Sequence, residues 1–210
     1  MVITVSKQTG SGEAFCGELA KSLAYRLINK EMVAYAAALS GISEAHAGQF
    51  DDVNYSRVSN WMANIIDLSL FKKANAEKDY RPYDTTASVT ADSFNETVSK
   101  IFHMLAQEGN CVVVGRGGNF ILKDHPNALH LRLVAPFEFR LTNIMAERGL
   151  SNKEAEKYIR ETDENKEKYI RKYYKAYITE AVAYHFTLNI GRYSTEEACA
   201  LIAGLTKERR

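Results

Sequence analysis

Hydrophobic and polar positions along the chain follow two different spacings. Short apolar-rich runs that are expected to be strands occupy residues 2–5, 111–114, 129–134 and 185–190, and the run at 111–114 is continuously apolar, as is typical of a strand buried on both faces. Between these runs, apolar residues recur every three or four positions, as they do on the buried face of a helix. Strands that alternate with helices predict an α/β fold with a doubly wound, mainly parallel sheet flanked by helices.

Capping residues and glycines set the expected ends of the helices. Asp92 is the expected N-cap of one helix, and Ser151 and Glu154 have the spacing of a capping box that opens a long charged helix. The polar segment 75–90 contains Pro82 and is expected to be a loop. Helices are expected at residues 12 to 27 or 28, 32–39, 43–50, 56–73, 92–109, 119–122, 137–149, 151–177 and from 194 onward.

The composition is that of a globular domain with a sizeable core. Of the 210 residues, 46% are apolar and 25% are charged, and the formal net charge is +1. A charge so close to zero gives no strong signal for nucleic acid, so any attraction to phosphate must be local. No apolar run approaches the roughly 20 residues of a membrane span, which predicts a protein without a membrane segment.

The three cysteines, Cys16, Cys111 and Cys199, are far apart and surrounded by apolar residues. We expect buried free thiols in a reducing compartment. Neither these cysteines nor the five scattered histidines have metal-ligand spacing, so no metal site is expected. Because a strand is expected from Val2, there is no room for a signal peptide, and the sequence predicts a cytoplasmic protein.

A glycine loop, Thr9-Gly10-Ser11-Gly12, joins the first strand to the first helix. Strand, glycine loop and helix point free N–H groups at one place, an arrangement that binds phosphate. A turn that needs glycine only for its geometry explains the pattern equally well. The side chains depart from the strict pattern G-x-x-x-x-G-K-[ST]: Lys7 stands at the first glycine, Glu13 stands at the lysine, and Phe15 follows without a hydroxyl for Mg²⁺.

A second glycine-rich segment, Gly115-Arg116-Gly117-Gly118, follows the buried strand at 111–114. Its glycines would let a ligand approach the backbone, and Arg116 offers a fork of donors suited to phosphate or to a base edge. The alternative is a strand-end turn with an exposed or salt-bridged arginine. Ligands of parallel α/β sheets bind at the carboxyl ends of the strands, where both glycine segments fall, so the pattern favours binding.

The long charged helix carries a basic run that acidic residues interleave. Such alternation is typical of a solvated helix face, and the other interpretation is a lid whose cations close over a transferring phosphoryl group. Arg140, Arg148 and Arg160 precede the run on neighbouring helices. The run consists of Lys166, Lys168, Arg171, Lys172 and Lys175, interleaved by Glu161, Asp163, Glu164 and Glu167.

With these residues in view, the chain resembles the cytidylate kinase-like family, a branch of the P-loop nucleoside monophosphate kinases. The Gly-Arg-Gly stretch followed by Asn-Phe-Ile-Leu is the most specific part of the resemblance, which spans nearly the whole chain. The stretches that carry it are residues 3–12 (ITVSKQTGSG), 110–122 (NCVVVGRGGNFIL), 134–140 (VAPFEFR), 147–151 (ERGLS) and 187–190 (TLNI).

The resemblance implies a single P-loop kinase-like domain over residues 1–210, with a helical monophosphate-binding insertion at 29–90 and a lid-like helical segment at 149–180. It implies phosphoryl transfer from ATP, with Mg²⁺, to a nucleoside monophosphate such as CMP. The implied ATP-binding residues are Ser6, Lys7, Gln8, Thr9, Gly10, Ser11 and Gly12. The implied substrate-binding residues are Gly115, Arg116, Gly117 and Asn119, and the implied catalytic cations are Arg116, Arg140, Arg160 and Arg171.

The chain departs from the family pattern at several charged positions. Glu13 and Ala14 stand where the family usually has Gly-Arg, Asn29 stands for an aspartate, and Glu164 and Lys166 stand for lid arginines. Two hypotheses follow. In the first, the chain is an ATP-dependent kinase acting on a nucleoside monophosphate or another small acceptor. In the second, it is a catalytically degenerate protein that binds a nucleotide or another anion as a sensor or interaction partner. The sequence also allows a homo-oligomer.

Overall fold

The computed structural model describes residues 1–29 and 91–208. The chain forms two compact units, one made of residues 1–29 and 105–210 and the other of residues 30–104. The helices expected at 32–39, 43–50 and 56–73 and the loop expected at 75–90 lie outside the described residues. The insertion expected at 29–90 lies outside them too, apart from Asn29, so the predicted division of the chain stays a prediction.

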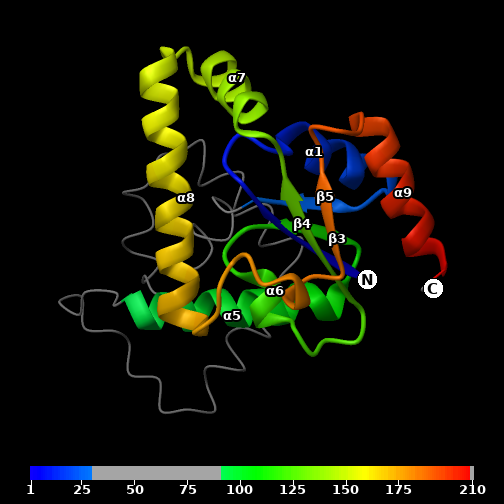
Figure 1. The fold of residues 1–210 in the computed structure, drawn as a ribbon. Coiled ribbons are helices and arrows are strands. Elements are labelled where there is room, and N and C mark those ends of the chain that lie inside the picture. Colours follow the sequence, from blue (N-terminus) through cyan, green and yellow to red (C-terminus); the bar gives the residue numbers. More distant parts are fainter. Residues whose placement is uncertain (30–90, 209–210) are drawn as a thin grey trace, which may run out of the picture. The chain divides into compact units, whose positions relative to one another are not determined.

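A five-stranded parallel sheet, in the order β2-β3-β1-β4-β5, forms the centre of the first unit and confirms the predicted fold class (Figure 1). Its strands are β1 (Val2–Lys7), β2 (Arg26–Ile28), β3 (Cys111–Val114), β4 (Ala128–Val134) and β5 (Phe186–Asn189). The helices are α1 (Glu13–Ser22), α5 (Ala91–Glu108), α6 (Gly118–Ile121), α7 (Phe137–Arg148), α8 (Asn152–Tyr174) and α9 (Thr195–Glu208), with a 3₁₀ turn, η2 (Ala181–Ala183).

Two helix boundaries differ from the expectation. The first helix ends at Ser22 rather than near residue 28, because Ala24 adopts a left-handed φ of 54° and the N–H of Tyr25 bonds back to Ala20. The chain then pairs with β3 as β2, which leaves Leu27 39% exposed. Asp92 lies inside α5 instead of capping it. The capping box of Ser151 and Glu154 at the start of α8 is confirmed.

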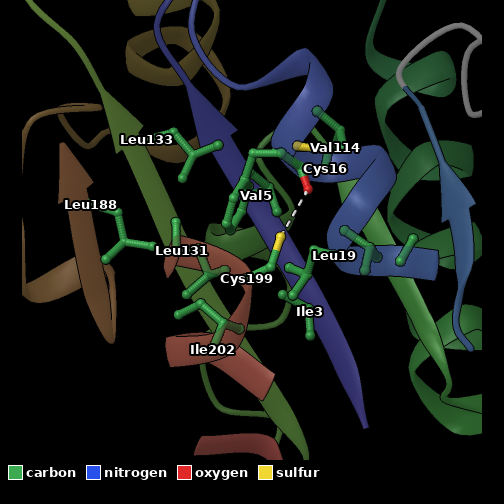
Figure 2. Close-up of a cluster of buried hydrophobic side chains, with 14 of the residues drawn as sticks. Ile3, Val5, Cys16, Leu19, Val114, Leu131, Leu133, Leu188, Cys199 and Ile202 are labelled. Carbon is green, nitrogen blue, oxygen red and sulfur yellow. Dashed lines mark hydrogen bonds between the residues drawn. The ribbon is translucent and has the colours of Figure 1, made fainter. Parts of the chain in front are cut away.

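One apolar core lies on the face of the sheet that α1 and α9 cover. Alternate side chains of β1 and β4, such as Ile3 and Leu131, pack there against Leu19 and Ile202 (Figure 2). The three cysteines are buried free thiols, as predicted, and burial raises the pKa of Cys16 to about 12. None of the helices in the described ranges is long and apolar enough to cross a bilayer.

Parallel pairing places the two glycine segments side by side. β1 lies between β3 and β4, with Val5 in register with Val114 on one side and with Leu131 on the other. The N–H of Gly115 extends this pairing by donating to the carbonyl of Val5 at 2.9 Å. The first glycine loop and the second therefore leave neighbouring strands at the carboxyl edge of the sheet, which is where ligands of such sheets bind.

Candidate functional site

The first glycine loop is held in place by its own side chains and by β4. The N–H of Gln8 donates to Leu133 O at 3.1 Å, and the Gln8 side-chain oxygen accepts the N–H of Ala135 at 3.0 Å. The hydroxyl of Ser11 is fully buried and donates to the Gln8 carbonyl at 2.8 Å. Two of the residues implied to bind ATP thus have side chains that fix the shape of the loop.

Gly10 is explained by the approach of α7. Its φ is +77°, and a Cβ at this position would lie 2.6 Å from the carbonyl oxygen of Arg140. Asn143, also on α7, donates its side-chain amide to Gly10 O at 3.0 Å. Only glycine fits between the loop and this helix, so internal packing accounts for the residue without a ligand.

A carboxylate from the lid-like helix lies against the loop. Asp163 of α8 accepts the Thr9 N–H at 2.9 Å and the Thr9 hydroxyl at 2.7 Å. Arg140 Nη1 donates to its other oxygen at 2.6 Å. Lys166 Nζ lies 3.3 Å from Asp163, 2.7 Å from the Thr9 hydroxyl and 3.1 Å from the Lys7 carbonyl oxygen. The loop, α7 and α8 therefore meet around one internal anion.

These contacts control the ionisation of Asp163. Partial burial alone would raise the pKa of this carboxyl, since it disfavours the charged form. The hydrogen bonds from Thr9, the charge of Lys166 and the hydrogen bond from Arg140 act the other way and outweigh it, so the pKa of Asp163 lies below its ordinary value. Asp163 is therefore a carboxylate at neutral pH.

The start of α1 carries an ion pair where a P-loop has its lysine. Glu13 is half exposed and pairs with Lys7 of β1, whose side chain is only 18% exposed. Lys21, the other lysine near this end of the chain, is 80% exposed and pairs with Glu18. Lys166 of α8, in contrast, reaches the loop and contacts its backbone at the Lys7 carbonyl.

The second glycine segment is covered by the end of α8. A Cβ at Gly117, whose φ is +72°, would lie 2.4 Å from the ring of Tyr174. The Tyr174 hydroxyl donates to the carbonyl of Arg116 at 3.3 Å, and its ring stacks on Phe120 at 5.4 Å between centroids. Asn119 is buried and donates to Ala183 O at 3.4 Å. Here, too, a neighbouring side chain explains the glycine.

The implied catalytic cations lie in different surroundings. Arg140 is 8% exposed and faces the loop through Asp163. Arg160 and Arg171 are on the outer surface of α8, where each pairs with a glutamate four residues earlier, Glu156 and Glu167 respectively. Arg116 follows β3 with a left-handed φ of 57°. The structure thus brings Arg140 to the first glycine loop. Arg160 and Arg171 are exposed on α8, and Arg160 also lies over the ring of Phe137 on α7 at 5.1 Å.

Asp163 was not among the predicted site residues and Lys166 was named only as one cation of the basic run, although the sequence contains a signal for both. Ile159, Asp163, Lys166 and Ile170 are spaced four, three and four residues apart and so share one face of α8. The two isoleucines are buried, at 1% and 3% exposed. Polar residues on the apolar stripe of an otherwise solvated helix indicate an inward-facing ion pair.

On the opposite face of the sheet, a polar cluster adjoins the predicted site. Ser6 lies beside Arg132 in the β1–β4 register, and the hydroxyl of Tyr184 is 3.4 Å from that of Ser6. Arg132 lies over the Tyr184 ring at 5.6 Å. Burial raises the pKa of Tyr184, which is therefore a neutral phenol at physiological pH.

Comparison with known proteins shows the family and the fold of the chain. The model of the cytidylate kinase-like family matches residues 2–192. The chain belongs to the cytidylate kinase-like family. No curated protein sequence matches this family member. Its fold is that of the P-loop kinases, as the similar solved structures also show.

Two solved structures illustrate the likeness. An uncharacterized protein from Eubacterium ventriosum superposes with a TM-score of 0.69 at 17% identity, covering 99% of this chain and 98% of its own. A shikimate kinase from Bacteroides thetaiotaomicron superposes with a TM-score of 0.51 at 13% identity, again covering 99% of this chain and 98% of its own. At such low identities these likenesses show the fold alone.

The family generally uses ATP and Mg²⁺. The residues at this edge of the sheet suit the phosphates of ATP better than they suit Mg²⁺. The Thr9 N–H, Arg140 and Lys166 are donors of the kind that hold phosphate oxygens. The donor set for Mg²⁺ does not fit, because the Ser11 hydroxyl is used within the loop and the Glu13 carboxylate pairs with Lys7. Within the described ranges, no group of three or more His, Cys, Asp or Glu side chains could hold a metal ion.

We predict that Gly117→Ala destabilises the protein more than Gly149→Ala. Both glycines have a left-handed φ, +72° and +64°, but no atom lies within 4 Å of a Cβ at Gly149. Each alanine should lose about 1 kcal/mol to backbone strain, and the clash with Tyr174 should add about 1–3 kcal/mol at Gly117. Urea unfolding measures both variants. Equal losses would contradict the contact with Tyr174.

We also predict that Asp163 stabilises the fold in a pH-dependent way. Because the pKa of Asp163 is lowered by folding, its contribution should be complete above the ordinary carboxyl pKa of about 3.9 and disappear as the pH falls through the lower folded value. At pH 7, Asp163→Asn should cost about 2 kcal/mol, and this cost should shrink towards pH 2. Urea unfolding between pH 7 and pH 2 measures this cost. Asp124→Asn, at an exposed aspartate, is the control for the loss of charge. A cost that does not change with pH would contradict the prediction.

Proposed function

We propose that the chain binds a nucleotide, or another small molecule with a phosphate group, at the carboxyl edge of its sheet without fast phosphoryl transfer. It would act as a sensor or an interaction partner rather than as an efficient kinase. Binding is supported by the donors that converge there: the Thr9 N–H, the buried Arg140 and Lys166. A cytoplasmic location and a homo-oligomeric state stay predictions.

The observation that supports slow phosphoryl transfer is the Lys7–Glu13 ion pair. Phosphoryl transfer depends on cations positioned around the transferring group, and removing one costs orders of magnitude in rate. Here Glu13 stands at the lysine position of the P-loop pattern. Its carboxylate also forms an ion pair with Lys7 of β1, so that this cation is already paired. A carboxylate beside a triphosphate is repulsive by about 4 kcal/mol at an effective dielectric constant of about 20.

The second candidate is a kinase that transfers a phosphoryl group from ATP to a nucleoside monophosphate such as CMP. The observation that favours it is Lys166, which brings a cation from α8 to the backbone of the loop. A lid lysine and the buried Arg140 could together replace the missing loop lysine. In this case Arg116 would contact the acceptor, as the family resemblance implies.

We predict nucleotide binding without efficient turnover. Calorimetric titration with ATP and with each nucleoside monophosphate should detect binding, and a coupled assay with ATP and Mg²⁺ should give a kcat at least about 1,000-fold below the 1–100 s⁻¹ typical of kinases. Turnover in the typical range that Arg116→Ala abolishes would establish the second candidate instead. Absence of binding by every nucleotide and by inorganic phosphate would contradict both.

We further predict that Glu13→Gln tightens ATP binding. The substitution removes a negative charge from the loop and releases Lys7, so the dissociation constant should fall about tenfold, the equivalent of about 1.4 kcal/mol. Glu18→Gln removes the same charge from the exposed side of α1, where Glu18 pairs with Lys21, and is the matched control. Equal effects of the two variants on the dissociation constant would show that Glu13 does not face the ligand.

A further inference from the structure

The carboxylate of Asp163 has the surroundings of a bound anion rather than those of a surface ion pair. Its Oδ1 accepts the Thr9 N–H, the Thr9 hydroxyl and Lys166 at 2.9, 2.7 and 3.3 Å, and its Oδ2 accepts Arg140 at 2.6 Å. A main-chain amide, a hydroxyl and two cations are the groups with which proteins hold a phosphate. The four donors converge from the loop, α7 and α8.

The donors are fixed by packing that does not involve the carboxylate. A separate apolar cluster joins α7 to α8 through Leu141, Ile144, Ala155 and Ile159. Thr9 is 6% exposed and Arg140 is 8% exposed. Rotation of one aspartate side chain would therefore leave the Thr9 amide and the Arg140 guanidinium in position for another anion.

The carboxylate leaves one donor at this place unused. Arg140 and Lys166 both contact Asp163, and a phosphate monoester, which carries about −1.5 to −2 charges at pH 7, offers more acceptor oxygens than a carboxylate. Arg140 Nε is buried without a hydrogen-bond partner among the described residues, so the carboxylate leaves one donor of this guanidinium unused.

We propose that Thr9, Arg140 and Lys166 form the phosphate-binding site of this edge, and that Asp163 is an internal competitor which a phosphate-bearing ligand must displace. The proposal rests on the proposed function and adds its regulation. The lid-like helix carries its own anion, which keeps the site closed to weak ligands. A ligand binds only if its phosphate binds these donors more strongly than the Asp163 carboxylate does.

The test compares inorganic phosphate and ATP as ligands of the wild type, Asp163→Asn and Asp124→Asn by calorimetric titration at low ionic strength. Removing the competitor raises the fraction of binding-competent sites, so Asp163→Asn should lower both dissociation constants about tenfold or more. Asp124→Asn removes the same charge at an exposed turn and should leave them unchanged. Lys166→Gln in the Asp163→Asn background should reverse the gain.

The outcomes separate this proposal from the proposed function. If the wild type and Asp163→Asn bind ATP equally well, Asp163 is a structural ion pair and the competition is refuted, while nucleotide binding stands. If neither binds phosphate nor ATP, both proposals fall. Tighter binding by Asp163→Asn alone supports both.

A measurement on the unmodified protein covers the case in which Asp163→Asn does not fold. The amide NMR resonance of Thr9 should shift when wild-type protein is saturated with phosphate, because the donor changes its acceptor. The amide of exposed Lys123 should not shift. Saturation that leaves the Thr9 resonance in place would overturn the proposal.

Discussion

Burial of the Arg140 guanidinium is the constraint on which the edge of this sheet depends. A charge taken out of water is costly unless an opposite charge and hydrogen bonds replace the lost solvent. Asp163 supplies that charge, and it brings α8 against the first glycine loop. The same aspartate accepts the Thr9 amide, which would otherwise be a buried donor without an acceptor. One carboxylate thus connects the loop, α7 and α8, which apolar packing between α7 and α8 also holds in place.

In the structure, the glycines of the two loops are explained by packing within the chain and not by the approach of a ligand. A motif assigns such residues to the close approach of a phosphate. Here the neighbours of Gly10 and Gly117 are the Arg140 carbonyl and the Tyr174 ring, both from the same chain. Glycine-rich segments at the end of a buried strand therefore locate the edge of the sheet, while the charged residues around them decide what it binds.

Much of the fold could be predicted because short apolar-rich segments alternate with stretches of helical spacing, and four of the five strands of the sheet were found that way. β2 was missed because three residues are too few to show a period, and Leu23 and Leu27 continued the helical spacing. At the site, the sequence predicted that both glycine segments lie at the carboxyl edge of the sheet, and the family resemblance named Arg140 as a candidate cation. It did not distinguish Asp163 from the other acids of α8, because charge alternation alone does not reveal which face is buried.

A single helix touches both glycine segments. Asp163 and Tyr174 are eleven residues apart on α8, about 16 Å along a helix axis, and they contact Thr9 and Gly117 respectively (Figure 1). A rigid shift of the whole helix would therefore disturb its contacts with both segments at once.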